Sequence, residues 1–223
     1  SVLGGDELFC GYPVFKQLTA LQKYTSLWKL PKFIRQSIAK GMSIPKIAKY
    51  EKFGRLLSAS SSSKKDFYPY FREIFNPALA SKVLANSCNQ SVFESILASH
   101  KNDPTLGWIS TTEISGYTQH VLLKDTDMCS MTNALEVRVP FFDHNLVEYV
   151  MSLPDVIKTP TTPKKLLTDA LGDDIPYETI HRQKMGFSFP WDVWIRNDLK
   201  NFVNETLNKS NQYEFFDSSA IQA

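Results

Sequence analysis

The chain has 223 residues, of which 43% are hydrophobic and 22% charged, and its formal net charge at pH 7 is +2. This composition is typical of a globular protein that buries a core, and so small a net charge gives no argument for a nucleic-acid partner. No apolar run is long enough to span a bilayer, so we expect no membrane partner either. The cysteines Cys10, Cys88 and Cys129 are widely spaced and odd in number, which favours reduced thiols in a cytoplasmic protein.

The chain opens on a pattern that predicts a tight turn followed by a helix. Gly4 and Gly5 have no Cβ, so the backbone can turn sharply and approach a ligand closely. Asp6 and Glu7 follow at once, and we expect both in the first turn of the helix. Negative charge is favourable there, and a carboxylate at that place is also suited to a metal near the turn.

Apolar residues recur at helical spacing through most of the chain, and strands of alternating polarity are nearly absent. The predicted helices cover 14–30, a short stretch from Pro31, 64–75, 77–85, 91–99, 108–123, 145–153, 164–171 and 190–207, and a capped helix begins within 216–221. The serine-rich stretch 58–65 is the best loop candidate, and Pro140 forbids a regular strand within 135–142. We therefore predict a mainly helical, single domain over residues 1–223.

The helix predicted over 108–123 is expected to be long and well buried. Ile114, Tyr117 and Val121 recur in it at spacings of three and four, which predicts one apolar stripe. Asp143 precedes the helix predicted over 145–153 and is better placed as its N-cap than as a ligand.

Three segments combine residues that carry chemistry. They are the opening turn, LGGDELF-GYP; residues 127–143, DMCSMTNALEVRVPFFD; and residues 182–194, RQKMGFSFPWDVW. Together they resemble the C-terminal synthetase domain of glutamine-dependent asparagine synthetases and their relatives, including β-lactam synthetases. The resemblance runs from Gly4 to about Trp194 and is weakest between about Lys40 and Lys101. The order of three specific motifs argues against a chance match.

The resemblance implies a fold and a reaction. The fold would be the helical C-terminal part of an α/β adenine nucleotide α-hydrolase-like (PP-loop ATP pyrophosphatase) domain. The S-G-G-x-D-S loop, the nucleotide-binding sheet and the glutaminase domain would lie upstream in a longer protein. In the family's reaction a carboxylate attacks the α-phosphorus of ATP, giving an acyl adenylate and pyrophosphate. Ammonia derived from glutamine then gives the amide and AMP, as in asparagine biosynthesis. This fragment alone is expected to be inactive.

The resemblance also implies roles for individual residues. Asp6 matches the aspartate that holds Mg²⁺, and Lys184 matches a lysine that steadies the transition state of adenylation. By itself, a lysine in a polar loop would be a solvated surface charge. Glu136 would lie on the side of the acyl acceptor and is a second catalytic candidate. The segment that would contact the nucleotide comprises Ser1, Val2, Gly4, Gly5 and Asp6.

Several residues admit more than one interpretation. If their segment is extended, Glu136 and Arg138 project to the same face, either as a buried ion pair or with Glu136 in a direct role. Asp127 and Ser130 either border the substrate pocket or make buried hydrogen bonds. Glu7 either orients Asp6 or a substrate group, or satisfies backbone amides.

This sequence departs from the family pattern near the turn. Leu3 stands where many asparagine synthetases have a glutamate that aids adenylation or deprotonates the amine, and Val2 and Cys10 stand where glycines are expected. The alternatives are therefore an amidotransferase for another carboxylate, such as a sugar acid, or a non-catalytic helical scaffold or binding module. Expected partners are ATP, aspartate or another carboxylate, ammonia from glutamine and, in a homodimer, a second copy of the chain.

Overall fold

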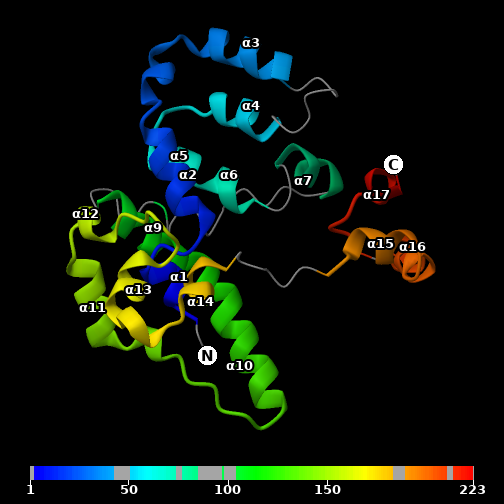
Figure 1. Cartoon of the computed structure of the whole chain (residues 1–223). Helices are drawn as coiled ribbons and strands as arrows, with labels where there is room; N and C mark the ends of the chain where they lie inside the picture. Colours follow the sequence, from blue (N-terminus) through cyan, green and yellow to red (C-terminus); the bar gives the residue numbers. More distant parts are fainter. Residues whose placement is uncertain are drawn as a thin grey trace. The chain divides into compact units, whose positions relative to one another are not determined.

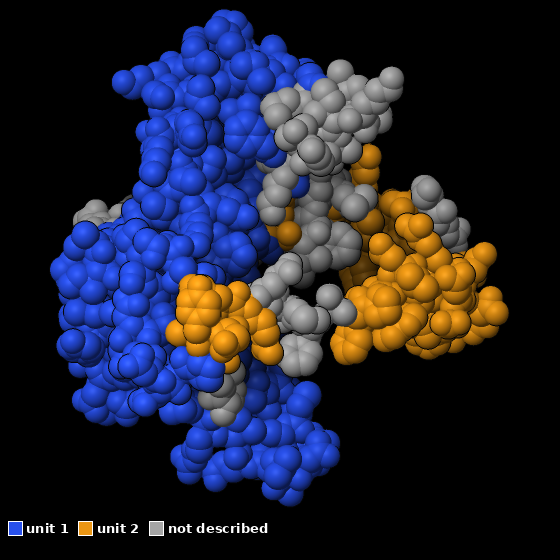
Figure 2. All heavy atoms as spheres, viewed as in Figure 1, with its two compact units in different colours: residues 1–72, 92–176 blue, residues 73–91, 177–223 orange. Residues whose placement is uncertain are grey.

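The computed structural model describes residues 3–42, 51–73, 77–84, Leu97, 104–182, 189–209 and 213–222. The chain divides into two compact units, coloured differently in Figure 2: Ser1–Arg72 with Val92–Pro176, and Glu73–Ser91 with Tyr177–Ala223. The single domain expected over residues 1–223 stays a prediction. Among the described helices, none is long and apolar enough to cross a membrane.

All regular elements in the described part of the first unit are helices (Figure 1). In chain order they are α1 (Gly5–Leu8), α2 (Pro13–Gln22), η1 (Thr25–Lys29), α3 (Lys32–Met42), α4 (Glu51–Leu57), α5 (Lys64–Phe67), α6 (Pro69–Arg72), α9 (Thr105–Glu113), η3 (Ile114–Leu122), α10 (Leu123–Thr132), η4 (Pro140–Phe142), α11 (His144–Ser152), α12 (Asp155–Lys158), α13 (Lys165–Leu171) and η5 (Gly172–Asp174).

The second unit is also helical where it is described. It contains α7 (Pro77–Val83), α14 (Tyr177–His181), α15 (Trp191–Arg196), α16 (Lys200–Asn208) and α17 (Ser218–Gln222). An isolated antiparallel bridge joins Leu84 to Phe216, and it is the one β pairing in the part of the chain that the structure describes. The prediction of a mainly helical fold is therefore confirmed.

Three predicted helices are interrupted, each for a local reason. The helix expected over 14–30 ends at Gln22 and gives way to the 3-10 turn η1, which begins at Thr25 and Ser26, residue types that favour turns over helix interiors. The helix expected over 64–75 is divided at Pro69, which has no N–H to donate. The last one, over 190–207, breaks at Asn197, whose side-chain amide donates to Val193 O at 2.9 Å. The helix expected over 91–99 lies outside the described residues apart from Leu97.

The core of the first unit forms around α2 and α9. α2 buries Val14, Phe15 and Leu18, and α9 buries Trp108 and Ile109, which are 1% and 0% exposed. Further members of this cluster are Cys10, Leu56, Ala59, Phe67, Tyr68, Leu97 and Leu106. The Tyr68 ring meets the Trp108 ring edge to face, with centroids 5.5 Å apart.

One continuous helix runs from Thr105 to Thr132 through α9, η3 and α10, and its middle part, η3, is a π-helix (Figure 1). The expected buried stripe of Ile114, Tyr117 and Val121 is wrong, because Tyr117 and Val121 are 36% and 40% exposed. Hydrogen bonds from i to i+5 widen each turn, so spacings of three and four no longer define one face. The buried positions in η3 are Gly116 and Thr118.

Candidate functional site

The opening turn has the backbone that its glycines predicted, and it packs against η4. Gly4 has φ 96, a left-handed conformation that suits glycine. A Cβ there would lie 2.9 Å from Phe141 Cβ and 3.1 Å from Phe142 Cε2, so only glycine fits. Asp6 and Glu7 lie in the first turn of α1, as predicted. The structure thus brings two of the three sequence motifs together, the opening turn and the end of residues 127–143.

The backbone conformation at Cys10 explains why the family pattern has a glycine at this position. Cys10 has φ 56, again in the left-handed region, where a side chain is strained. Its thiol is 2% exposed, and burial raises the pKa of Cys10 to about 12, with smaller and opposing effects from Lys158 and Asp155. A thiol with so high a pKa is a poor nucleophile, so Cys10 is a packing residue.

The carboxylate of Asp6 faces a lysine that the sequence analysis did not single out. Lys164 Nζ lies 3.4 Å from Asp6 Oδ1, and the two side chains are 32% and 22% exposed. Lys164 adopts φ 57 and ψ 31 at the N-cap of α13. In the sequence it is the first residue of the short helix predicted over 164–171 and carries no local signal of its own. Its place beside Asp6 comes from packing.

Gly11 makes room for this pair. A Cβ on Gly5 would be in ordinary contact with Lys164 Nζ, at 3.6 Å. A Cβ on Gly11 would lie 2.0 Å from Asp6 Oδ1 and 2.9 Å from Lys164 Cε, so any side chain there would displace both groups. The Asp6 carboxylate and the Lys164 ammonium therefore lie together at a partly exposed place, with the carboxylate packed against Gly11.

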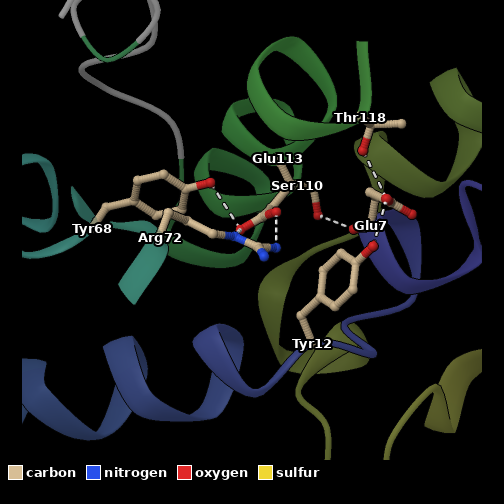
Figure 3. Close-up of polar contacts among 7 residues, drawn as sticks. All are labelled: Glu7, Tyr12, Tyr68, Arg72, Ser110, Glu113 and Thr118. Carbon is tan, nitrogen blue, oxygen red and sulfur yellow. Dashed lines mark hydrogen bonds and ion pairs between the residues drawn. The ribbon is translucent and has the colours of Figure 1, made fainter. Parts of the chain in front are cut away.

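Glu7 is buried beneath this turn and anchors it (Figure 3). Its Oε1 accepts hydrogen bonds from Tyr12 Oη at 3.0 Å and from Thr118 Oγ1 at 2.7 Å, and its backbone oxygen accepts from Ser110 Oγ at 2.8 Å. Burial and the charge of Glu7 raise the pKa of Tyr12. Both of these carboxylate contacts are to hydroxyls of the protein, so Glu7 ties α1 to the long helix.

A second buried network lies next to the first (Figure 3). Glu113 is 0% exposed and accepts from Tyr68 Oη at 2.8 Å and from Arg72 Nε at 2.8 Å, and a second guanidinium nitrogen completes the ion pair. The Arg72 guanidinium also lies over the rings of Tyr12 and Tyr117, 4.7 and 4.8 Å from their centroids. Burial, reinforced by Glu113, raises the pKa of Tyr68. Arg72 therefore joins α6 to both networks.

None of the predicted residues in the 127–143 motif is buried, and most of them are exposed. Glu136 and Arg138 form an ion pair of 2.7 Å, but their side chains are 70% and 84% exposed, so the buried pair considered from the sequence is wrong. Their segment crosses the surface without regular structure, because Pro140 follows it. Asp127 and Ser130 bond to each other at an exposed place on α10, Ser130 Oγ donating to Asp127 O at 3.1 Å, so the buried alternative is wrong for them too.

Asp143 is the N-cap that the sequence predicted. Its carboxylate accepts from Asn145 N at 3.0 Å and Leu146 N at 3.3 Å at the start of α11. Ser1, Val2 and Lys184 lie outside the described residues, so their roles, like that of Glu136, stay predictions.

Within the described ranges, no group of three or more His, Cys, Asp or Glu residues could hold a metal ion. Asp6 supplies one partly exposed carboxylate. Mg²⁺ usually takes one or two carboxylates and completes its shell with water and phosphate oxygens, so Asp6 fits a magnesium ion bound mainly by a nucleotide.

Comparisons with known proteins agree on one family. The family model described as asparagine synthase matches residues 3–223. Asparagine synthetase (glutamine-hydrolyzing) 1 of Bacillus subtilis is 24% identical over 213 residues, covering 93% of this chain and 33% of that protein. A putative asparagine synthetase (glutamine-hydrolyzing) of Mycobacterium bovis is 27% identical over 224 residues, covering 98% and 34%. The chain thus spans about a third of the length of these relatives. No solved structure matches it significantly.

Proposed function

Because the chain belongs to the asparagine synthase family, we propose that it forms part of an ATP-dependent ligase that converts a carboxylate into an amide. The ammonia would come from glutamine, as the names of the relatives suggest. The observation that carries this proposal is the partly exposed Asp6–Lys164 pair, whose carboxylate occupies the space that a Cβ on Gly11 would take.

In this proposal each residue of the turn has a task. Asp6 would hold Mg²⁺, which when bound neutralises charge on the leaving pyrophosphate. The Lys164 ammonium is a compact donor suited to phosphate oxygens. Gly11 leaves room for the Asp6 carboxylate. Lys184 would act on the α-phosphate during adenylation, and Glu136 on the side of the acceptor.

In the first chemical step the protein does little covalent chemistry. Attack of the substrate carboxylate on the α-phosphorus forms the acyl adenylate and releases pyrophosphate, and ammonia then displaces AMP. The protein positions the reactants and stabilises the charge that develops on the phosphates. Both tasks require a rigidly held turn, and the buried bonds of Glu7 to Tyr12 and Thr118 supply that rigidity.

The proposal leaves two candidates for the carboxylate that is converted into an amide. Leu3 has no acid–base group, so it cannot do the work of the glutamate found there in many asparagine synthetases. This favours, as a second candidate, an amidotransferase for a carboxylate other than aspartate, such as a sugar acid. A scaffold without catalysis would retain the buried networks but have no use for the Asp6–Lys164 pair. We further propose a cytoplasmic location and a homodimer.

The test is pyrophosphate release by the longer protein that carries this chain, with ATP, Mg²⁺ and a panel of carboxylic acids. We expect Asp6→Asn and Lys164→Met each to lower the rate ~10²-fold or more, as the loss of one charge-stabilising group does. Lys165→Met is the matched control, because Lys165 adjoins Lys164 but forms an exposed pair with Asp169. Equal rates for Lys164→Met and Lys165→Met would refute the assignment, and turnover by the 223-residue chain alone would refute its predicted inactivity.

A further inference from the structure

The small net charge hides an uneven distribution along the chain. Residues 8–50 contain no Asp or Glu and eight basic residues, which are Lys16, Lys23, Lys29, Lys32, Arg35, Lys40, Lys46 and Lys49. Because the whole chain carries only +2, the remainder carries a net negative charge. An anionic partner would therefore meet one strongly basic segment in an otherwise acidic chain.

The described part of this segment also exposes large apolar side chains. Between residues 23 and 40, the exposed apolar residues are Tyr24, Leu27, Leu30, Phe33, Ile34 and Ile38. The exposed basic residues in the same range are Lys23, Lys29, Lys32 and Lys40. We call these ten residues the 23–40 surface. It extends from the residues just before η1 to α3, which Figure 1 labels, and all of it belongs to the first unit.

The buried side chains of α3 lie on one narrow face. Among its residues 32–41, only Arg35 and Ala39 are buried, and they lie four apart on one narrow face. Arg35 Nη1 donates to the backbone oxygens of Leu57 and Ala59 at 2.6 and 2.9 Å. This buried cation therefore stabilises the fold and is not part of the exposed basic surface. The other faces of α3 are directed outward, including Phe33, which is 69% exposed.

Helices that lie in the interface of an anionic bilayer typically have lysines interspersed with exposed aliphatic and aromatic residues. The 23–40 surface has this composition and contains no acidic residue. The lysines meet the anionic headgroups, and the apolar side chains enter the boundary between headgroups and acyl chains. Nucleic acid fits less well, because four of the six apolar residues are aliphatic and cannot stack on bases. We propose that the 23–40 surface binds the surface of an anionic lipid bilayer.

This proposal replaces the expectation, drawn from net charge and the absence of a spanning run, that no membrane is among the partners. It is tested by co-sedimentation of the 223-residue chain with vesicles of phosphatidylcholine, with and without phosphatidylserine. We expect binding only to the vesicles that contain phosphatidylserine, and weaker binding as salt increases. Lys29→Glu with Lys32→Glu should weaken binding at least tenfold, since each basic residue contributes about fivefold.

Two further comparisons separate this proposal from others. Lys200→Glu with Lys209→Glu makes the same change in net charge at exposed residues outside the 23–40 surface, so it should bind normally. Phe33→Ser with Ile38→Ser leaves the charge unchanged and should also weaken binding, because the apolar contacts are lost. Both side chains are exposed, so an unchanged unfolding midpoint is expected for each variant and verifies the fold.

Four outcomes would overturn the proposal. The first is no binding to phosphatidylserine vesicles at low salt. The second is a loss of binding in the Lys200 and Lys209 variant equal to that in the Lys29 and Lys32 variant. The third is tighter binding to a single-stranded oligonucleotide than to vesicles, unaffected by the Phe33 and Ile38 substitutions. The fourth is a longer protein carrying this chain that fails to bind where the chain binds, because the 23–40 surface would then be covered by another domain.

Discussion

Replacing Gly11 by alanine should disturb the proposed site while changing the stability of the fold only a little. Gly11 has no positive φ, so its backbone accepts an alanine. The added Cβ would lie 2.0 Å from Asp6 Oδ1, and real Cβ contacts do not occur below 3.0 Å, so the carboxylate must move by roughly 1 Å. The three obstructing atoms, Asp6 Oδ1, Asp6 Cγ and Lys164 Cε, belong to partly exposed side chains that can rotate away.

The consequence for stability should therefore be small and the consequence for catalysis large. Loss of the partly exposed Asp6–Lys164 pair costs about 0.2–1 kcal/mol, while a displacement of about 1 Å in a positioned group lowers a rate by ~10²-fold. The assays are urea unfolding of the 223-residue chain and pyrophosphate release by the longer protein carrying Gly11→Ala.

Gly41→Ala is the matched control for this substitution. Gly41 lies in α3, and a Cβ added there would have no atom within 4 Å, so alanine should raise the free energy of unfolding by about 0.5–1 kcal/mol and leave the rate unchanged. A normal rate in Gly11→Ala would refute the reasoning, because Asp6 would then be displaced without effect. A large loss of stability would show that the turn cannot yield as argued.

Three further predictions concern the buried groups beneath the turn. Arg72→Met leaves the fully buried Glu113 without its cation and should lower the free energy of unfolding by about 3–5 kcal/mol in urea titrations; a change below about 1 kcal/mol would contradict the buried ion pair. Thr118→Val removes the 2.7 Å bond to Glu7 and should cost about 1–3 kcal/mol in the same assay, with Thr118→Ser restoring most of it. Because the pKa of Cys10 rises from 9.0 unfolded to about 12 folded, the folded state keeps its proton longer, and stability should fall by roughly 1 kcal/mol per pH unit as pH rises from 9. Cys10→Gly should reduce that slope between pH 9 and 10, because the raised pKa values of Tyr12 and Tyr68 contribute to it in the same direction, and an unchanged slope would exclude the thiol as a source.

Local patterns determined much of this protein without any tertiary information. The paired glycines and following acids predicted the turn and α1, because a glycine backbone and a helix N-terminus are local properties. Asp143 was predicted as an N-cap for the same reason. The three motifs indicated the family, which the match over residues 3–223 confirms.

Only the tertiary structure decided which groups meet. Lys164 stands 158 positions after Asp6 and carries no motif, so its place beside that carboxylate depends on the packing of α13 against the opening turn. Glu7 looked like a partner for Asp6 or for backbone amides, yet packing directs it to hydroxyls on the long helix and on Tyr12. The π-helical turn in η3 makes Thr118 a buried residue and leaves Val121 exposed. Sequence spacing assumes a regular helix and near neighbours, whereas contacts between distant elements follow from how their surfaces fit.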